Sequence, residues 1–175
     1  IGLLVRGGDA ESLPIELPGK TSIENDTSLA LTHVSGESNA GSGMDIVVVH
    51  GLYGDPFGTW KSAGAEKVFW PNWLTTDIDG VRIWTLQWPS AGHSFSSSGE
   101  MALQEVADAS LSLLASSGLG DRNLVFVGHS MGGLLIKQML QTAAIMREES
   151  WSLILARTVG TVFMGTPHNG AALAN

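Results

Sequence analysis

The stretch LVFVGHSMGGLLIKQML, residues 124–140, places a serine between glycines where one apolar pattern gives way to another. The run before the serine, residues 124–127, is continuously apolar, which predicts a strand buried on both faces, as in a parallel sheet. After the serine, leucine, isoleucine and methionine recur at helical spacing, which predicts an amphipathic helix from Gly133 onward. Ser130 therefore lies in a turn that leads from a buried strand into a helix.

Residues 128–132, GHSMG, have the G-x-S-x-G spacing of a nucleophile elbow. A serine on so sharp a turn crowds its neighbours, so the positions two before and two after it must be small. The turn lifts the hydroxyl clear of the sheet edge, and it makes the backbone N–H of Met131 an expected oxyanion-hole donor. The alternative is a glycine-rich turn without chemistry. The strand and the helix on either side favour a nucleophilic Ser130.

A second motif, VVVHGLYGDPFGTW, follows another compact apolar run at residues 46–49, which predicts an earlier buried strand. His50 and Gly51 stand at the end of that strand, where the backbone N–H of Leu52 is the expected second oxyanion-hole donor. Gly51 and Gly54 allow the loop to approach the substrate oxygen closely. We interpret His50 as a packing and hydrogen-bonding residue and not as a base.

The rest of the chain continues the alternation of strands and helices. SLALTHVSG predicts a short edge strand, and VRIWTLQW predicts a buried one. Ser97 and Glu100 form a capping-box pattern ahead of a helix, and ILARTVGTVFMG predicts a last strand. The order indicates an α/β fold with a mostly parallel sheet flanked by helices. We expect residues 1–44 to be an N-terminal segment that contributes edge strands to the same domain, which residues 45–175 continue.

Composition excludes several functions for this 175-residue chain. Its net charge of −8 argues against electrostatic binding of nucleic acid. The absence of cysteine excludes disulfides and thiolate metal sites, and no apolar run approaches the roughly 20 residues of a transmembrane helix. No ligand cluster or phosphate-binding loop motif is present, so we expect neither a metal nor a cofactor.

Four stretches together resemble the α/β-hydrolase superfamily, in particular its lipase-like serine-active-site family. They are VVVHGLYGDPFGTW, FWPNWL, GDRNLVFVGHSMGGLLIKQML and TVFMGTPHNGAALA, and they extend over about residues 45–175. Members of this family are implicated in phosphatidylglycerol remodelling, and similar domains are hydrolase heads of NOD-like or STAND signalling proteins. The resemblance implies that Ser130 is the nucleophile and that Leu52 and Met131 are the oxyanion-hole donors. It also implies that the loop GTPHNG, with His168 and Asn169, faces the substrate.

The partners of a catalytic serine are missing from the expected positions. In this fold an acid and then a histidine follow the serine along the chain. After Ser130 there is no aspartate, the only acids are Glu148 and Glu149, and the only histidine is His168. We expect the two glutamates to be solvated, and we leave His168 open between a structural role and that of the base. The sheet is therefore expected to be truncated after its sixth strand, with the triad acid and histidine supplied by a C-terminal fragment or another chain.

These observations predict a serine ester hydrolase that acts through an acyl-Ser130 intermediate on lipid or other acyl esters. Without its base, the chain alone should be nearly inactive. Two alternatives stay open: a regulated effector head of a signalling protein, and a binding-only pseudoenzyme. The expected location is intracellular, in the cytoplasm or peripheral to a membrane.

Overall fold

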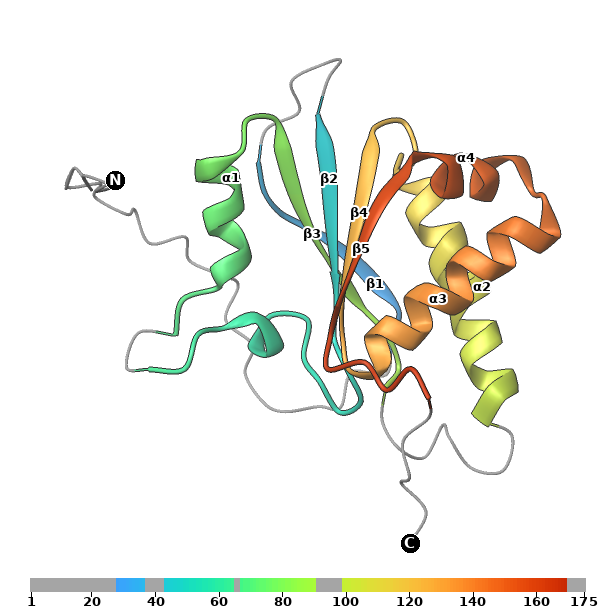
Figure 1. Ribbon diagram of the computed structural model, residues 1–175, viewed down its shortest axis with the longest axis horizontal. Helices are drawn as coiled ribbons and strands as arrows, with labels where there is room; N and C mark the ends of the chain where they lie inside the picture. Colours follow the sequence, from blue (N-terminus) through green and yellow to red (C-terminus); the bar gives the residue numbers. More distant parts are fainter. Residues whose placement is uncertain (1–27, 37–42, 65–66, 91–98, 170–175) are drawn as a thin grey trace, which may run out of the picture.

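The computed structural model describes residues 28–36, 43–64, 67–90 and 99–169. In this part of the chain five strands form one sheet (Figure 1). Their order across the sheet is β1 (Ala30–Ser35), β3 (Val81–Gln87), β2 (Met44–Val49), β4 (Asn123–His129) and β5 (Thr158–Met164). β1 is antiparallel to β3, and the other neighbours are parallel.

The register of the parallel strands brings two loops to the same edge of the sheet. β2 and β4 are neighbours, and Val49 lies opposite Gly128. The segments that follow these residues therefore emerge side by side at the carboxyl edge of the strands. This is the edge where ligands bind in open parallel α/β sheets.

Helices cover both faces of the sheet, as Figure 1 shows. On one face lie α2 (Gly99–Ser116), α3 (Met131–Met146) and α4 (Glu149–Arg157), and on the other lie α1 (Trp73–Asp77) and the 3-10 turns η1 (Gly58–Trp60) and η2 (Trp70–Asn72). Alternate residues of β2 feed the two cores: Val47 and Val49 pack towards α2 and α3, and Ile46 and Val48 pack towards Trp60. The continuous apolar run predicted this burial on both faces.

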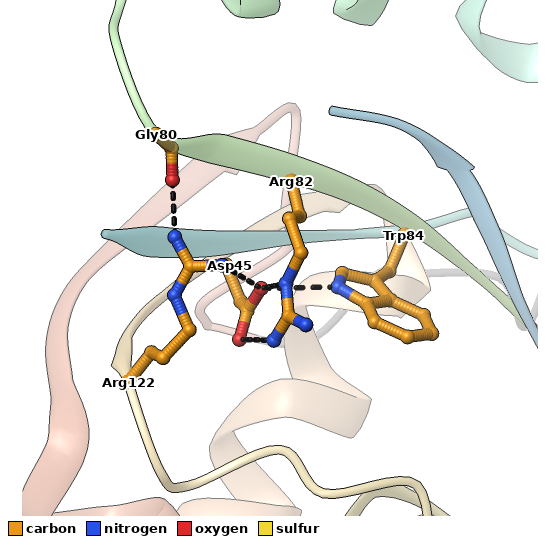
Figure 2. A network of polar contacts seen from close by, with 5 residues as sticks. All are labelled: Asp45, Gly80, Arg82, Trp84 and Arg122. Carbon is orange, nitrogen blue, oxygen red and sulfur yellow. Dashed lines mark hydrogen bonds and ion pairs between the residues drawn. The ribbon is translucent and has the colours of Figure 1, made fainter. Parts of the chain in front are cut away.

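At the amino edge of the sheet, a buried carboxylate connects three strands (Figure 2). Asp45, on β2, is fully buried and accepts two hydrogen bonds from Arg82 of β3, at 2.6 and 2.7 Å. The indole Nε1 of Trp84 donates to the same carboxylate at 3.2 Å. Arg122, just before β4, lies 4.0 Å from Asp45 and donates to the carbonyl of Gly80. Two guanidinium groups around one carboxylate fix the relative positions of these strand starts, and the hydrogen bond that Arg82 donates to Asp45 raises the pKa of Arg82.

Most of the predicted elements are confirmed, and two boundaries were wrong. The strands predicted around residues 46–49, in VRIWTLQW and around residues 124–127 are β2, β3 and β4, and SLALTHVSG contains β1. The last strand, however, begins at Thr158, because residues 154–157 belong to α4. The helix after the serine begins at Met131 and not at Gly133. Ser97 of the capping box lies outside the described residues. None of the helices in the described part is long and apolar enough to cross a bilayer.

Candidate active site

Ser130 occupies the turn between β4 and α3 in a strained backbone conformation. Its φ of 52° and ψ of −122° lie in a region that side chains other than glycine rarely adopt. The turn is held by backbone hydrogen bonds, from the Ser130 N–H to the carbonyl of Met164 at 2.8 Å and from the Gly133 N–H to the carbonyl of Ser130 at 3.1 Å. Ser130 is also the N-cap of α3, yet its side chain makes no capping hydrogen bond. Its hydroxyl is therefore not used to stabilise the helix.

Close backbone approaches explain the glycines around Ser130. A Cβ atom at Gly128 would lie 2.6 Å from the Cα of Gly133. At Gly132, a Cβ would overlap the carbonyl oxygens of Val49 and His50. The requirement for small residues two before and two after the serine is thus confirmed. Both contacts are with backbone that the sheet and α3 hold in place.

The loop after β2 lies against Ser130. A Cβ at Gly51 would be 2.9 Å from the Cβ of Ser130, so only a glycine lets the two segments come this close. The Gly54 N–H donates to the Gly51 carbonyl at 3.0 Å, and the Tyr53 N–H donates to the Ser90 carbonyl at 3.2 Å. The N–H of Leu52, between them, has no acceptor among the described residues.

The amide of Met131 is similarly available. As the first residue of α3, Met131 has no carbonyl one turn earlier in the helix to accept from its N–H. No other described residue accepts from it. Each of the two loops at Ser130 thus has one backbone N–H, of Leu52 or of Met131, without an acceptor among the described residues. This is the arrangement that an oxyanion hole requires.

His50 holds the loop after β2 through both ring nitrogens. The imidazole is fully buried, with Nδ1 2.9 Å from the Gly51 carbonyl and Nε2 3.4 Å from the Trp88 N–H. We assign the proton to Nδ1, since the carbonyl can only accept and the amide can only donate. The Trp88 indole donates to the His50 carbonyl at 2.8 Å and stacks on the ring. Burial lowers the pKa of His50 and keeps it neutral, as suits a positioning residue.

His168 lies in the turn that follows β5. Because the carbonyl of Met164 accepts from the Ser130 N–H, this turn starts next to the serine. The Nδ1 of His168 is 2.6 Å from the Nζ of Lys137, and its ring meets Phe163 edge-on. A charged lysine only donates, so Nδ1 is the acceptor here. Asn169, the neighbouring residue, is exposed.

The remaining titratable candidates are engaged elsewhere. Glu148 caps α4 by accepting from the Trp151 N–H at 2.9 Å, and its carboxylate also accepts from the Ser150 hydroxyl. The Ser150 bond, and then the Trp151 bond, lower the pKa of Glu148. Glu149 is exposed in the first turn of α4. Both follow the far end of α3, which at ~1.5 Å per residue is more than 20 Å from Ser130.

Sequence reasoning missed one residue near this edge, Lys137. It is exposed on α3, seven residues after Ser130, and contacts His168. Seven residues correspond to two helical turns, so Lys137 and Ser130 share a side of the helix. That spacing was the available signal, although the contact with the turn after β5 could not be read from it.

Comparison with known proteins places the chain in a family. The model of the "Alpha/beta hydrolase family" matches residues 46–174. Human Protein SERAC1 is 32% identical over 148 residues, which cover 74% of this chain and 22% of that protein. The zebrafish protein of the same name is 30% identical over 164 residues, with 82% and 25% covered. The chain thus spans about a fifth to a quarter of the length of these relatives.

A solved structure is also similar. Brefeldin A esterase, described as a bacterial homologue of human hormone sensitive lipase, shares 16% identity. The match covers 82% of this chain and 41% of that chain, with a TM-score of 0.33. So low a score supports no argument about fold or activity, which rest on the family match and on the geometry above. The chain belongs to the alpha/beta hydrolase family.

Proposed function

We propose that this domain is a serine ester hydrolase that forms an acyl intermediate on Ser130. The observation that supports this most strongly is the strained backbone of Ser130, at a strand-to-helix turn with a second loop pressed against it. Strain of this kind persists only where the surrounding structure enforces it, and it concentrates at active sites. Membership of a hydrolase family supports the same class of reaction.

The proposed reaction uses the two loops at the carboxyl edge. The Ser130 oxygen attacks the ester carbonyl carbon, and its proton passes to a base and then to the departing alkoxide as the ester C–O bond breaks. The backbone N–H groups of Leu52 and Met131 would donate to the oxyanion of each tetrahedral intermediate. Water then attacks the acyl-serine and releases the acid, and the proton returns to Ser130 through the same base.

We propose that the base and the triad acid come from another part of the full-length protein. Residues 131–175 contain no aspartate, and the glutamates of this segment lie at the start of α4. His168 is the only histidine of the segment, and its Nδ1 is hydrogen-bonded to Lys137. In a catalytic triad this nitrogen is bonded to the acid that orients the histidine, so an acid could not bind there. The relatives are several times longer than this chain, so they contain further sequence that could supply both residues.

The proposed substrates are lipids or other acyl esters, with the turn at His168 and Asn169 facing them. The resemblance to a family implicated in phosphatidylglycerol remodelling supports this class. The turn starts at Met164, whose carbonyl accepts from the Ser130 N–H, and this proximity to Ser130 supports the proposal.

The test is the hydrolysis of short-chain acyl esters by the full-length protein. Ser130→Ala should reduce kcat by about a thousandfold or more, because no nucleophile remains. Ser112→Ala, at an exposed site on α2, is the matched control and should leave turnover unchanged. Turnover that survives Ser130→Ala, while the protein remains folded, would refute the proposal.

A binding-only domain is the second candidate, since the base has no place among the residues that follow Ser130 in this chain. It predicts that the full-length protein binds esters without turnover. A regulated effector head is a variant of the hydrolase proposal, and the relatives carry sequence well beyond this domain. It predicts that ester turnover changes when the full-length protein oligomerises.

A further inference from the structure

Lys137 and His168 form a pair of basic side chains outside the catalytic loops. The Nζ of Lys137 is 2.6 Å from the Nδ1 of His168. The Phe163 ring supports both, with the His168 ring edge-on at 5.0 Å between centroids and the Lys137 Nζ 5.7 Å from the ring centroid. The side chains of Lys137, Phe163 and His168 thus hold one another in place, although Lys137 and His168 are exposed.

This pair carries positive charge that the protein does not neutralise. Within the described residues, neither Lys137 nor His168 has a carboxylate within ion-pair distance. The chain as a whole has a net charge of −8, so a cation without a carboxylate partner is unexpected here. Because Nδ1 of His168 accepts from Lys137, the ring proton is on Nε2, which points away from the ammonium group. The remaining N–H bonds of the Lys137 ammonium are therefore the donors available to an anion at this position.

The pair is also close to the candidate nucleophile. Lys137 follows Ser130 by seven residues on the same helix, a rise of about 10 Å. His168 belongs to the turn that begins at Met164, the residue bonded to the Ser130 N–H. A group bound to the Lys137 ammonium would therefore be several bonds away from an ester carbonyl held at Ser130.

We propose that Lys137, which His168 and Phe163 hold in place, binds a negatively charged group of the ester substrate. This inference rests on the proposed function and narrows it to anionic esters, whose charge is separated from the reacting carbonyl by several bonds. A phosphate and a carboxylate share the required chemistry, since both accept hydrogen bonds from an ammonium group. Phe163 fixes the pair in advance, so little side-chain entropy is lost when the anion binds.

The experiment compares charged and neutral esters in the full-length protein. One pair is dihexanoyl phosphatidic acid against dihexanoylglycerol, both below their critical micelle concentrations. The other is the 4-nitrophenyl monoester of adipic acid against its methyl ester. Lys137→Met keeps the length of the side chain but removes the charge. It should lower kcat/KM about two- to fivefold, through KM, for a charged ester and leave its neutral counterpart unchanged.

Matched variants separate this role from a general loss of charge or structure. Arg157→Met removes one positive charge from an exposed residue next to the amino edge of the sheet, and it should affect neither ester. Lys137→Arg should restore the preference for the charged ester, and His168→Gln should weaken it. The phosphate pair and the carboxylate pair together identify which anion is preferred. An equal loss on charged and neutral esters would overturn the inference, because Lys137 would then only support the turn. No loss on either would also overturn it.

A binding measurement distinguishes failure of this inference from failure of the proposed function. If the wild-type protein hydrolyses none of the four esters, the proposed function fails. The anion site is then tested by titrating Ser130→Ala with glycerol 3-phosphate and with adipate while the His168 NMR signals are followed. Saturable shifts that disappear in Lys137→Met support the site, and shifts that persist in that variant, or none at all, overturn it.

Discussion

Ser130 combines a backbone conformation suited to glycine with a side chain that carries a hydroxyl group. A positive φ with ψ near −122° costs a residue with a Cβ about 1–3 kcal/mol. Serine is among the preferred N-cap residues, yet here its hydroxyl forms no cap. The strained backbone and the missing capping bond both reduce stability. Both also leave the hydroxyl free at the carboxyl edge of the sheet. A residue chosen for stability alone would be glycine.

Replacing this residue should separate stability from function. Ser130→Gly relieves the strain, whereas Ser130→Ala retains it, so Ser130→Gly should be more stable by about 1–2 kcal/mol in urea-induced unfolding. The pair Ser112→Gly and Ser112→Ala in α2 provides the control, where the glycine variant should be the less stable by about 1 kcal/mol. Equal stability of the two Ser130 variants would show that the backbone there is unstrained.

At the scale of elements, the site depends on how closely α3 packs against the loop after β2. The first turn of α3 touches the carbonyls of Val49 and His50, with Gly132 at the contact. The same turn meets the side chain of Thr166 at Gly133. The two glycines after the serine therefore bring three chain segments together, and the unpaired amides of Leu52 and Met131 follow from that packing.

Gly132→Ala should disturb this packing. The added methyl group would overlap carbonyl oxygens held by β2, so we expect a loss of about 1–3 kcal/mol in the free energy of unfolding. Ester turnover by the folded variant should also fall, because the loop that carries Leu52 must shift to make room for the methyl group. Gly160→Ala in β5 is the control, since its Cβ would only reach Val125 at 3.7 Å. If calorimetry found both variants as stable as the wild type, the close approach at Gly132 would be wrong.

At the scale of the whole molecule, the two edges of the sheet differ: one carries the candidate active site and the other a buried polar network. The carboxyl edge carries the strained Ser130 and the backbone amides of Leu52 and Met131, which are unpaired among the described residues. The amino edge carries the buried network of Asp45, which links the starts of β2, β3 and β4 (Figure 2). This network fixes the three central strands at the edge opposite to Ser130.

Asp45→Asn should therefore destabilise the protein without altering the chemistry at Ser130. Neutralising this carboxylate leaves Arg82 and Arg122 facing each other without compensation, which should cost about 3 kcal/mol in the free energy of unfolding. Asp121→Asn, at an exposed site nearby, should change stability by less than about 0.5 kcal/mol. Chemical denaturation measures both. A stable Asp45→Asn variant would mean that the network does not hold the strand starts.

The sequence predicted the parallel sheet, the turn from strand to helix at Ser130 and the loop after β2, because each depends on local periodicity and glycine spacing. It misplaced the last strand because the short apolar run ILAR is compatible with either a helix or a strand. A pattern of single residues also gave no sign of Asp45, one acid at the start of an apolar run, or of the contact between Lys137 and His168. Both are contacts between residues more than 30 positions apart, which only the packed fold determines.

The most direct test of the central claim is covalent labelling of the full-length protein with a fluorophosphonate probe, followed by mass spectrometry of the digested peptides. We predict that the probe modifies Ser130 within the peptide that contains GHSMGG, and that the label disappears in Ser130→Ala. Denaturing the protein before labelling should also abolish the modification, because the reactivity comes from the folded site. A native, folded full-length protein that leaves Ser130 unlabelled, or that labels equally well in Ser130→Ala, would contradict the account.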